Sequence, residues 1–328
     1  MGLYQSYQGS RIIKLELCDV HLTSVDCVLF FTSSISVSFL LLSFLLRSLR
    51  EYRFSLKHII LLKTDNSAVL NGKSAGNMAV DEIHAANGVR SKHDFSGLKV
   101  NQSRLMDGIH SGCKYGAAHR YGEDPTETGM ARLSLNDADK QVRDWFMATA
   151  ESLNCKTSVD QMGNLFAIRP GKNSSAPPIM MGSHLDTQPT GGRYDGILGV
   201  NAGLEVLTVL HENNVETEGN IGVVNWTNEE GARFPMMAVS SGVWAEAVPL
   251  DTAWNLAEVS PGTDGQRKTM RQELERIGYL GPVQASYRAM PMACHFEVHI
   301  EQGPVLEIER RRVGVVKGMS LVSLTGKY

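Results

Sequence analysis

The sequence contains no Cys-x-x-Cys pair and carries little net charge. Its 328 residues include five cysteines that lie far apart, at Cys18, Cys27, Cys113, Cys155 and Cys294. This spacing argues against a zinc finger, and the odd number argues against a disulfide framework, so we expect reduced thiols in an intracellular, cytoplasmic location. A formal net charge of −3 gives no reason to expect nucleic acid as a partner. No internal repeat is evident, and the length fits one large or two ordinary domains.

The first 97 residues differ from the rest and are predicted to be an extension outside the main fold. Residues 27–46 contain no charged side chain and are just long enough to cross a bilayer as a helix. The run contains serine and threonine, however, and it begins too late for an ordinary signal peptide. Three interpretations stay open: a membrane anchor, an unstructured or wrongly predicted extension, and a buried helix. The arginines that follow would favour a cytoplasmic main domain if this is an anchor, and residues 64–97 are interpreted as a linker.

From residue 98 onward, the sequence predicts alternating helices and strands. Apolar residues at helical spacing and capping signals predict helices at 101–111, 136–153, 197–210, 240–247 and 266–277. Short apolar or alternating runs predict strands at 156–160, 164–169, 178–182, 220–226 and 294–300, and residues 112–133 are interpreted as loop. The alternation predicts an α/β fold with a mostly parallel sheet flanked by helices. Polar residues at the strand ends would then meet in one crevice.

Potential metal ligands stand in three short Gly-rich turns. His184 and Asp186 lie in Gly-Ser-His-Leu-Asp-Thr, Asp195 lies in Gly-Gly-Arg-Tyr-Asp-Gly, and Glu230 lies in Thr-Asn-Glu-Glu-Gly. His299 follows on the polar face of the last predicted strand, and Asp186 can reach the second ring nitrogen of His184. One imidazole and three carboxylates suit two divalent cations, which can polarise a carbonyl and lower the pKa of a bound water. The pattern therefore predicts a metallohydrolase.

Each motif also has an ordinary structural interpretation when it is taken alone. Asp195 in a Gly-rich turn is typical of a helix N-cap, Glu229-Glu230 can be a solvated acidic turn, and His299 can be a hydrogen-bonded core histidine. The functional interpretation of Glu229-Glu230 is a division of labour, because adjacent carboxylates are costly unless a cation or proton shares their charge. One would bind metal and the other would transfer protons. Four weak signals at strand ends together favour a site.

Longer stretches around these residues resemble the hydantoinase/carbamoylase family. This family holds N-carbamoyl-L-amino acid hydrolases, allantoate amidohydrolases and some β-ureidopropionases, within the larger aminoacylase/carboxypeptidase-like group. The resemblance runs from Leu98 to Lys317, and it is carried by GSHLDT from Gly182, GGRYDGILGV from Gly191, NWTNEEGARF from Asn225, SGVW from Ser241 and HIEQGPVLE from His299. It implies a dinuclear zinc-aminopeptidase-like catalytic domain at 98–318, followed by a divergent tail at 319–328.

The resemblance also implies an activity and residue roles. Hydroxide bound to two divalent ions, zinc or manganese, would attack the carbamoyl carbon of a small ureido compound such as an N-carbamoyl-L-amino acid and cleave its C–N bond. One metal would be held by His184, Asp195 and His299, and the other by Asp195 and Glu230. Glu229 would be the general base, Asp186 would orient His184, and Gln302 would contact substrate.

The family pattern continues past the end of this chain, through a smaller dimerisation domain and back into the catalytic domain. That return supplies another histidine for the second metal and further substrate contacts. We therefore expect the inserted domain, the homodimer it forms, the last ligand and part of the sheet to be absent here, with about one metal held tightly and negligible hydrolysis. Two alternatives stay open: a dinuclear aminoacylase or peptidase, and a non-catalytic remnant that binds one metal or a full-length partner. A third, membrane contact, rests on residues 27–46 alone.

Overall fold

The computed structural model describes residues 26–31 and 97–316. The predictions for 32–46, for nearly all of the linker and for the tail at 319–328 lie outside the described residues. The described elements are β1 (Asp26–Phe31), α3 (Gln102–Gly112), β2 (Ala117–Arg120), β3 (Thr128–Met130), α4 (Asp137–Ser152), β4 (Lys156–Val159), β5 (Leu165–Arg169), β6 (Ile179–His184), α5 (Ile197–Glu212), β7 (Ile221–Trp226), α6 (Val239–Trp244), α7 (Leu250–Trp254), α8 (Met270–Ile277), β8 (Cys294–Ile300), α9 (Val305–Ile308) and β9 (Val313–Val315).

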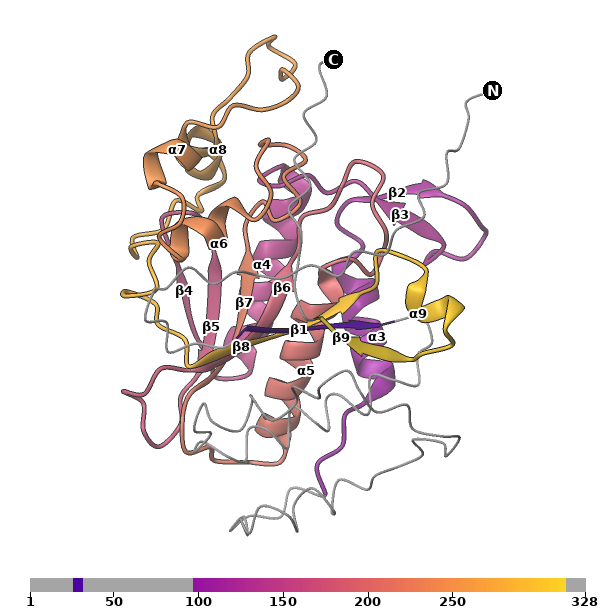
Figure 1. Ribbon diagram of the computed structural model, residues 1–328, viewed down its shortest axis with the longest axis vertical. Coiled ribbons are helices and arrows are strands. Elements are labelled where there is room, and N and C mark those ends of the chain that lie inside the picture. Colours follow the sequence, from indigo (N-terminus) through magenta and orange to yellow (C-terminus); the bar gives the residue numbers. More distant parts are fainter. Residues whose placement is uncertain (1–25, 32–96, 317–328) are drawn as a thin grey trace, which may run out of the picture.

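A seven-stranded sheet in the order β4-β5-β7-β6-β8-β1-β9 forms the centre of the described fold (Figure 1). Strands β7, β6, β8 and β1 run parallel to one another, whereas β4, β5 and β9 pair antiparallel to their neighbours. The α/β class is confirmed, but the sheet is mixed where a mostly parallel one was expected. The short connection between β4 and β5 permits only antiparallel pairing of these two strands. Strands β5 and β9 also pair antiparallel, with β7 and β1, through contacts between residues far apart in the sequence.

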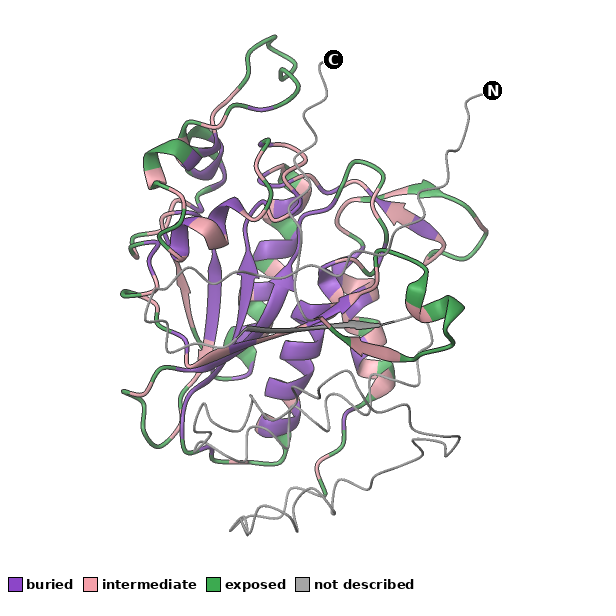
Figure 2. Ribbon diagram, viewed as in Figure 1, coloured by how far each residue is buried: buried purple, intermediate pink, exposed green. Residues whose placement is uncertain are grey.

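Helix α5 packs against β6, β7 and β8 and is buried along nearly its whole length (Figure 2). Glycines allow this close approach. A Cβ on Gly199 would lie 2.7 Å from the carbonyl oxygen of Val298 and 2.8 Å from the Ser183 side chain. Because a buried helix needs apolar residues on most of its faces, the sequence around 197–210 is apolar well beyond a single stripe. The helix therefore fixes the ends of the three strands that carry the candidate site.

The predicted helix starts are confirmed at two caps. The side chain of Asn101 accepts a hydrogen bond from the backbone N–H of Arg104 at 3.1 Å, and that of Asn136 accepts one from Asp139 at 2.8 Å. Such caps satisfy N–H groups that have no partner in the first turn. The predicted strands and longer helices are confirmed within a few residues.

Several parts of the structure differ from the sequence predictions. Residues 117–130, within a predicted loop, form the hairpin of β2 and β3, whose strands are short and lack an alternating apolar pattern. The short helices α7 and α9 and the strand β9 were not predicted. Residues 26–31, predicted to lie outside the main fold, form β1, which pairs in parallel with β8. The start of the apolar segment is therefore a strand that completes an edge of β8, and the rest of the proposed domain division stays a prediction. No helix in the described part of the chain is long and apolar enough to span a membrane.

Candidate metal centre

The predicted ligands come together at one edge of the sheet. His184 ends β6, the Glu229-Glu230 turn follows β7, and His299 lies near the end of β8. Because these three strands are parallel, their carboxyl ends share an edge, where ligand sites of α/β sheets form. Asp195 reaches the same place from the turn that precedes α5.

Three side chains converge closely enough to hold one ion. Ligand atoms of His184, Asp195 and His299 all lie within 4.8 Å of one another. The two Nε2 atoms are 3.5 Å apart, and Asp195 Oδ1 lies 3.6 Å from Nε2 of His184 and 3.0 Å from Nε2 of His299. Ligands at about 2.0–2.2 Å from a tetrahedral ion would be separated by roughly 3.4 Å. The triangle therefore has the size that a zinc-like ion requires.

The hydrogen bonds of the two histidines point to a cation. Nδ1 of His184 lies 2.8 Å from the carbonyl oxygen of Asp186, and Nδ1 of His299 lies 2.8 Å from that of Ile300. A carbonyl oxygen only accepts, so each Nδ1 carries a proton and each neutral ring presents a lone pair at Nε2. Two lone pairs and a carboxylate oxygen then face one another. This arrangement is repulsive unless a proton or a metal ion lies between them.

The electrostatics of the buried groups agree with this. Burial lowers the pKa of His184, but Glu229 and Asp195 outweigh that effect and hold the pKa well above its ordinary value. Burial raises the pKa of Asp195, but the two histidines hold it well below its usual range. Burial also raises the pKa of Asp186 to about 7 and that of Glu230 above its ordinary value. A proton or a cation beside these carboxylates would therefore stabilise this edge of the sheet.

Asp186 connects two parts of the site. Its carbonyl oxygen fixes the ring of His184, whereas its carboxylate accepts the backbone N–H groups of Glu229 and Glu230 at 3.2 and 3.3 Å. The residue that was expected to orient His184 thus contacts it through the main chain. The carboxylate instead anchors the acidic turn.

The two glutamates of this turn differ in their surroundings. Glu229 Oε2 lies 3.5 Å from Nε2 of His184, and its side chain is 28% exposed. Glu230 is buried, and its Oε1 has no hydrogen-bonding partner among the described residues. It does not join the group of three ligands, but a buried carboxylate oxygen without a donor fits a place for a second cation.

Two supporting residues were not predicted from the sequence. The carboxamide of Gln188 donates to Glu230 Oε2 at 2.9 Å and to its carbonyl oxygen at 3.2 Å. The fully buried guanidinium of Arg132 donates to the carbonyl oxygen of Leu185 at 2.6 Å. Gln188 stands four residues after His184, and that proximity is the one sequence signal that could have indicated it. Nothing near Arg132 in the sequence indicates its role.

Gln302 lies at the mouth of the site. Its exposed side chain donates to Asp195 Oδ2 at 3.3 Å, so the residue predicted to contact substrate is next to a predicted metal ligand. The predicted site residues are thus all at one edge of the sheet.

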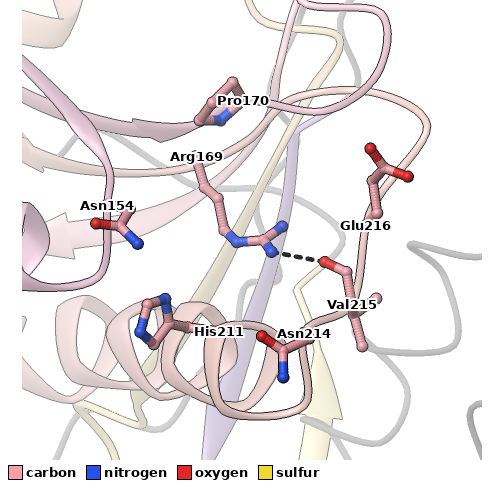
Figure 3. Close-up of a pocket in the computed structure, with 7 residues that line it drawn as sticks. All are labelled: Asn154, Arg169, Pro170, His211, Asn214, Val215 and Glu216. Atoms are coloured by element: carbon pink, nitrogen blue, oxygen red, sulfur yellow. Dashed lines mark hydrogen bonds between the residues drawn. The ribbon is translucent and has the colours of Figure 1, made fainter.

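A separate pocket of about 260 Å³ lies at the other end of α5 (Figure 3). It is lined by Asn154, Arg169, Pro170, His211, Asn214, Val215 and Glu216. The helix spans 16 residues, or about 24 Å at 1.5 Å per residue, and the candidate metal centre lies at its opposite end. The pocket is therefore not part of that centre.

The chain matches one protein-family model and several known amidohydrolases. Residues 180–326 match the model of Peptidase family M20/M25/M40, and the described chain has the M20 fold. The chain is 41% identical over 218 residues to an N-carbamoyl-L-amino-acid amidohydrolase of Rhizobium meliloti, covering 66% of this chain and 49% of the relative. It is 33% identical over 202 residues to one of Geobacillus stearothermophilus, covering 61% and 47%.

A solved structure shows the same relationship. A hydantoinase/carbamoylase family amidase from Burkholderia multivorans superposes with a TM-score of 0.58 at 44% identity, covering 65% of this chain and 48% of that one. The resemblance to the hydantoinase/carbamoylase family is therefore confirmed. The chain spans about half the length of the curated relatives that it matches.

Proposed function

We propose that this chain carries the metal centre of an amidohydrolase that cleaves the C–N bond of a ureido group. The convergence of His184, Asp195 and His299, with three acceptor atoms facing one point, carries this proposal. The names of the relatives support the bond type, since two of them are N-carbamoyl-L-amino-acid amidohydrolases. An N-carbamoyl-L-amino acid is therefore the substrate class that we infer.

The ligand set fits two divalent ions, with zinc or manganese as the candidates. His184, Asp195 and His299 would hold one ion, and Asp195 together with Glu230 would provide ligands for the other. Nitrogen and carboxylate donors of this kind suit both metals. When bound, such ions polarise a carbonyl and lower the pKa of a water.

Glu229 is the residue that we propose as the general base. Its carboxylate is partly exposed and reaches to 3.5 Å from a predicted ligand nitrogen, so it is accessible to a water beside the predicted ligands. It would take a proton from the attacking water and deliver it to the nitrogen that leaves as ammonia. The carbamate that remains on the amino acid would then lose carbon dioxide to give the free amino acid. Asp186 would keep Glu229 in place through the backbone N–H, and Gln302 would contact the substrate at the mouth.

A pair of substitutions tests this assignment of roles. In a chain extended to the full length of its relatives, we expect Glu229→Gln to retain the metal content and to lower the rate of ammonia release from N-carbamoyl-L-amino acids by roughly 10²–10⁴-fold. Glu230→Gln is expected to weaken the binding of the second metal ion. Metal content per chain is measured by elemental analysis after dialysis. Equal loss of metal in both variants would reject the roles.

The description of the matching family as peptidases favours one second candidate, a dinuclear aminoacylase or peptidase. The same ligands would serve, and only the substrate differs. Hydrolysis of N-acetyl amino acids or dipeptides in preference to N-carbamoyl amino acids would select this candidate. One tight ion with no hydrolysis of any of these compounds would instead favour a non-catalytic metal-binding chain.

A further inference from the structure

Two residues of the loop after β6 hold Glu230 from opposite directions. The Asp186 carboxylate accepts the backbone N–H of Glu230 at 3.3 Å, and the Gln188 carboxamide donates to its backbone carbonyl at 3.2 Å. Both main-chain polar groups of Glu230 are therefore bound to one short stretch of chain. The orientation of this residue is set by the loop that directly follows His184.

The side chain of Glu230 is constrained as well. Gln188 Nε2 donates to Oε2 at 2.9 Å, whereas Oε1 is buried and has no hydrogen-bonding partner among the described residues. The Gln188 amide therefore holds the Glu230 carboxylate in one orientation. In that orientation Oε1 is left without a donor from the described part of the chain and can face a cation.

Asp195 shows the same arrangement. Gln302 donates to its Oδ2 at 3.3 Å, while its Oδ1 faces the two histidines. Glu229 differs from both, because its carboxylate contacts His184 Nε2 at 3.5 Å and its side chain is 28% exposed. Glu230, the predicted metal ligand, thus accepts a hydrogen bond from an amide, whereas the adjacent Glu229, the predicted base, contacts a histidine.

We propose that Gln188 is a positioning residue that holds the Glu230 carboxylate with Oε1 available to the proposed second metal ion. This inference rests on the proposed function, since it requires Glu230 to be a metal ligand. An outer-shell partner of this kind orients a ligand and tunes its affinity. Without the amide, the Glu230 carboxylate is free to turn out of this orientation.

The experiment is a titration of the metal-free chain with Co²⁺, read by visible absorption and by elemental analysis. The test variant is Gln188→Leu, and the control is Gln141→Leu on the exposed face of α4. We expect the first ion, at His184, Asp195 and His299, to bind as in the wild type. The second ion is expected to bind roughly 10- to 100-fold more weakly in Gln188→Leu.

The outcomes separate this inference from the proposed function. Identical affinity and spectrum for the second ion in Gln188→Leu and Gln141→Leu would overturn the role of Gln188 while leaving the metal centre intact. A wild-type chain that binds one Co²⁺ and no second ion would also overturn the role of Gln188, because no metal ion would then reach Glu230. A wild-type chain that binds no Co²⁺ would overturn the proposed function itself. If thermal unfolding shows that Gln188→Leu does not fold, Gln188→Asn, whose amide is one methylene shorter, is tested against the same two outcomes.

Discussion

Gly196 joins a predicted metal ligand to helix α5 in a conformation that other residues rarely adopt. Its φ and ψ are 68° and −53°, and the N–H of Ile197 donates to the carbonyl oxygen of Asp195 at 2.8 Å. This is a γ-turn with positive φ, which is strained for any residue with a Cβ. A Cβ at this position would lie 2.5 Å from Nδ1, Cε1 and the carbonyl oxygen of His184.

Gly196→Ala should therefore damage the site in two ways. Holding alanine in this backbone conformation costs about 1–3 kcal/mol of stability. The ring of His184 must also move by about 1 Å to restore an ordinary contact of about 3.5 Å, whereas metal–ligand distances tolerate changes of only about 0.2 Å. We expect metal affinity to fall at least about 10- to 100-fold, the loss seen when an outer-shell support is removed.

Gly192→Ala is the matched control, because a Cβ at Gly192 meets nothing within 4 Å. Both glycines belong to the same motif, and the same mass is added in each case. Metal affinity is measured by competition with a chromophoric chelator, and stability by thermal unfolding of the metal-free chains. Equal metal affinity in the two variants would refute the claim that the γ-turn positions His184.

Two further predictions concern buried charges. Arg143 and Asp139 form a fully buried ion pair at 2.8 Å in α4, so Arg143→Met should lower the free energy of urea unfolding by about 3–5 kcal/mol. The control Lys140→Met removes an exposed pair with the same i,i+4 spacing and should cost no more than about 0.5 kcal/mol. Similar costs for the two variants would contradict this prediction. Burial raises the pKa of Asp160 from 3.8 to about 6 in the folded chain. Between these two pKa values the folded state keeps a proton that the unfolded state has lost. The free energy of unfolding should therefore fall by about 3 kcal/mol as the pH rises through that window. Urea unfolding at pH 4 and pH 7 should show this component in the wild type and not in Asp160→Asn, and equal differences between the two pH values would show that Asp160 is not its source.

The sequence by itself predicted the α/β class, the longer helices and the strands of the sheet centre. These elements have strong local signals, such as the cap at Asn136 and the continuous apolar run of β7, which are independent of distant contacts. It also indicated the predicted ligand residues. His184, Asp195 and Glu230 stand in short Gly-rich stretches next to a strand or a helix, and His299 lies on the polar face of a strand. Candidate metal ligands of this kind can be recognised from residue type and spacing.

Only the tertiary structure decided how the strands pair and which atoms meet. The antiparallel pairing of β5 with β7 and the insertion of β1 beside β8 depend on contacts between residues far apart in the sequence. The same holds for the hydrogen bonds of Gln188 to Glu230, and for the use of the Asp186 carbonyl in place of its carboxylate towards His184. Such hydrogen bonds depend on directions and on distances of a few tenths of an ångström, which folding fixes and residue order does not record.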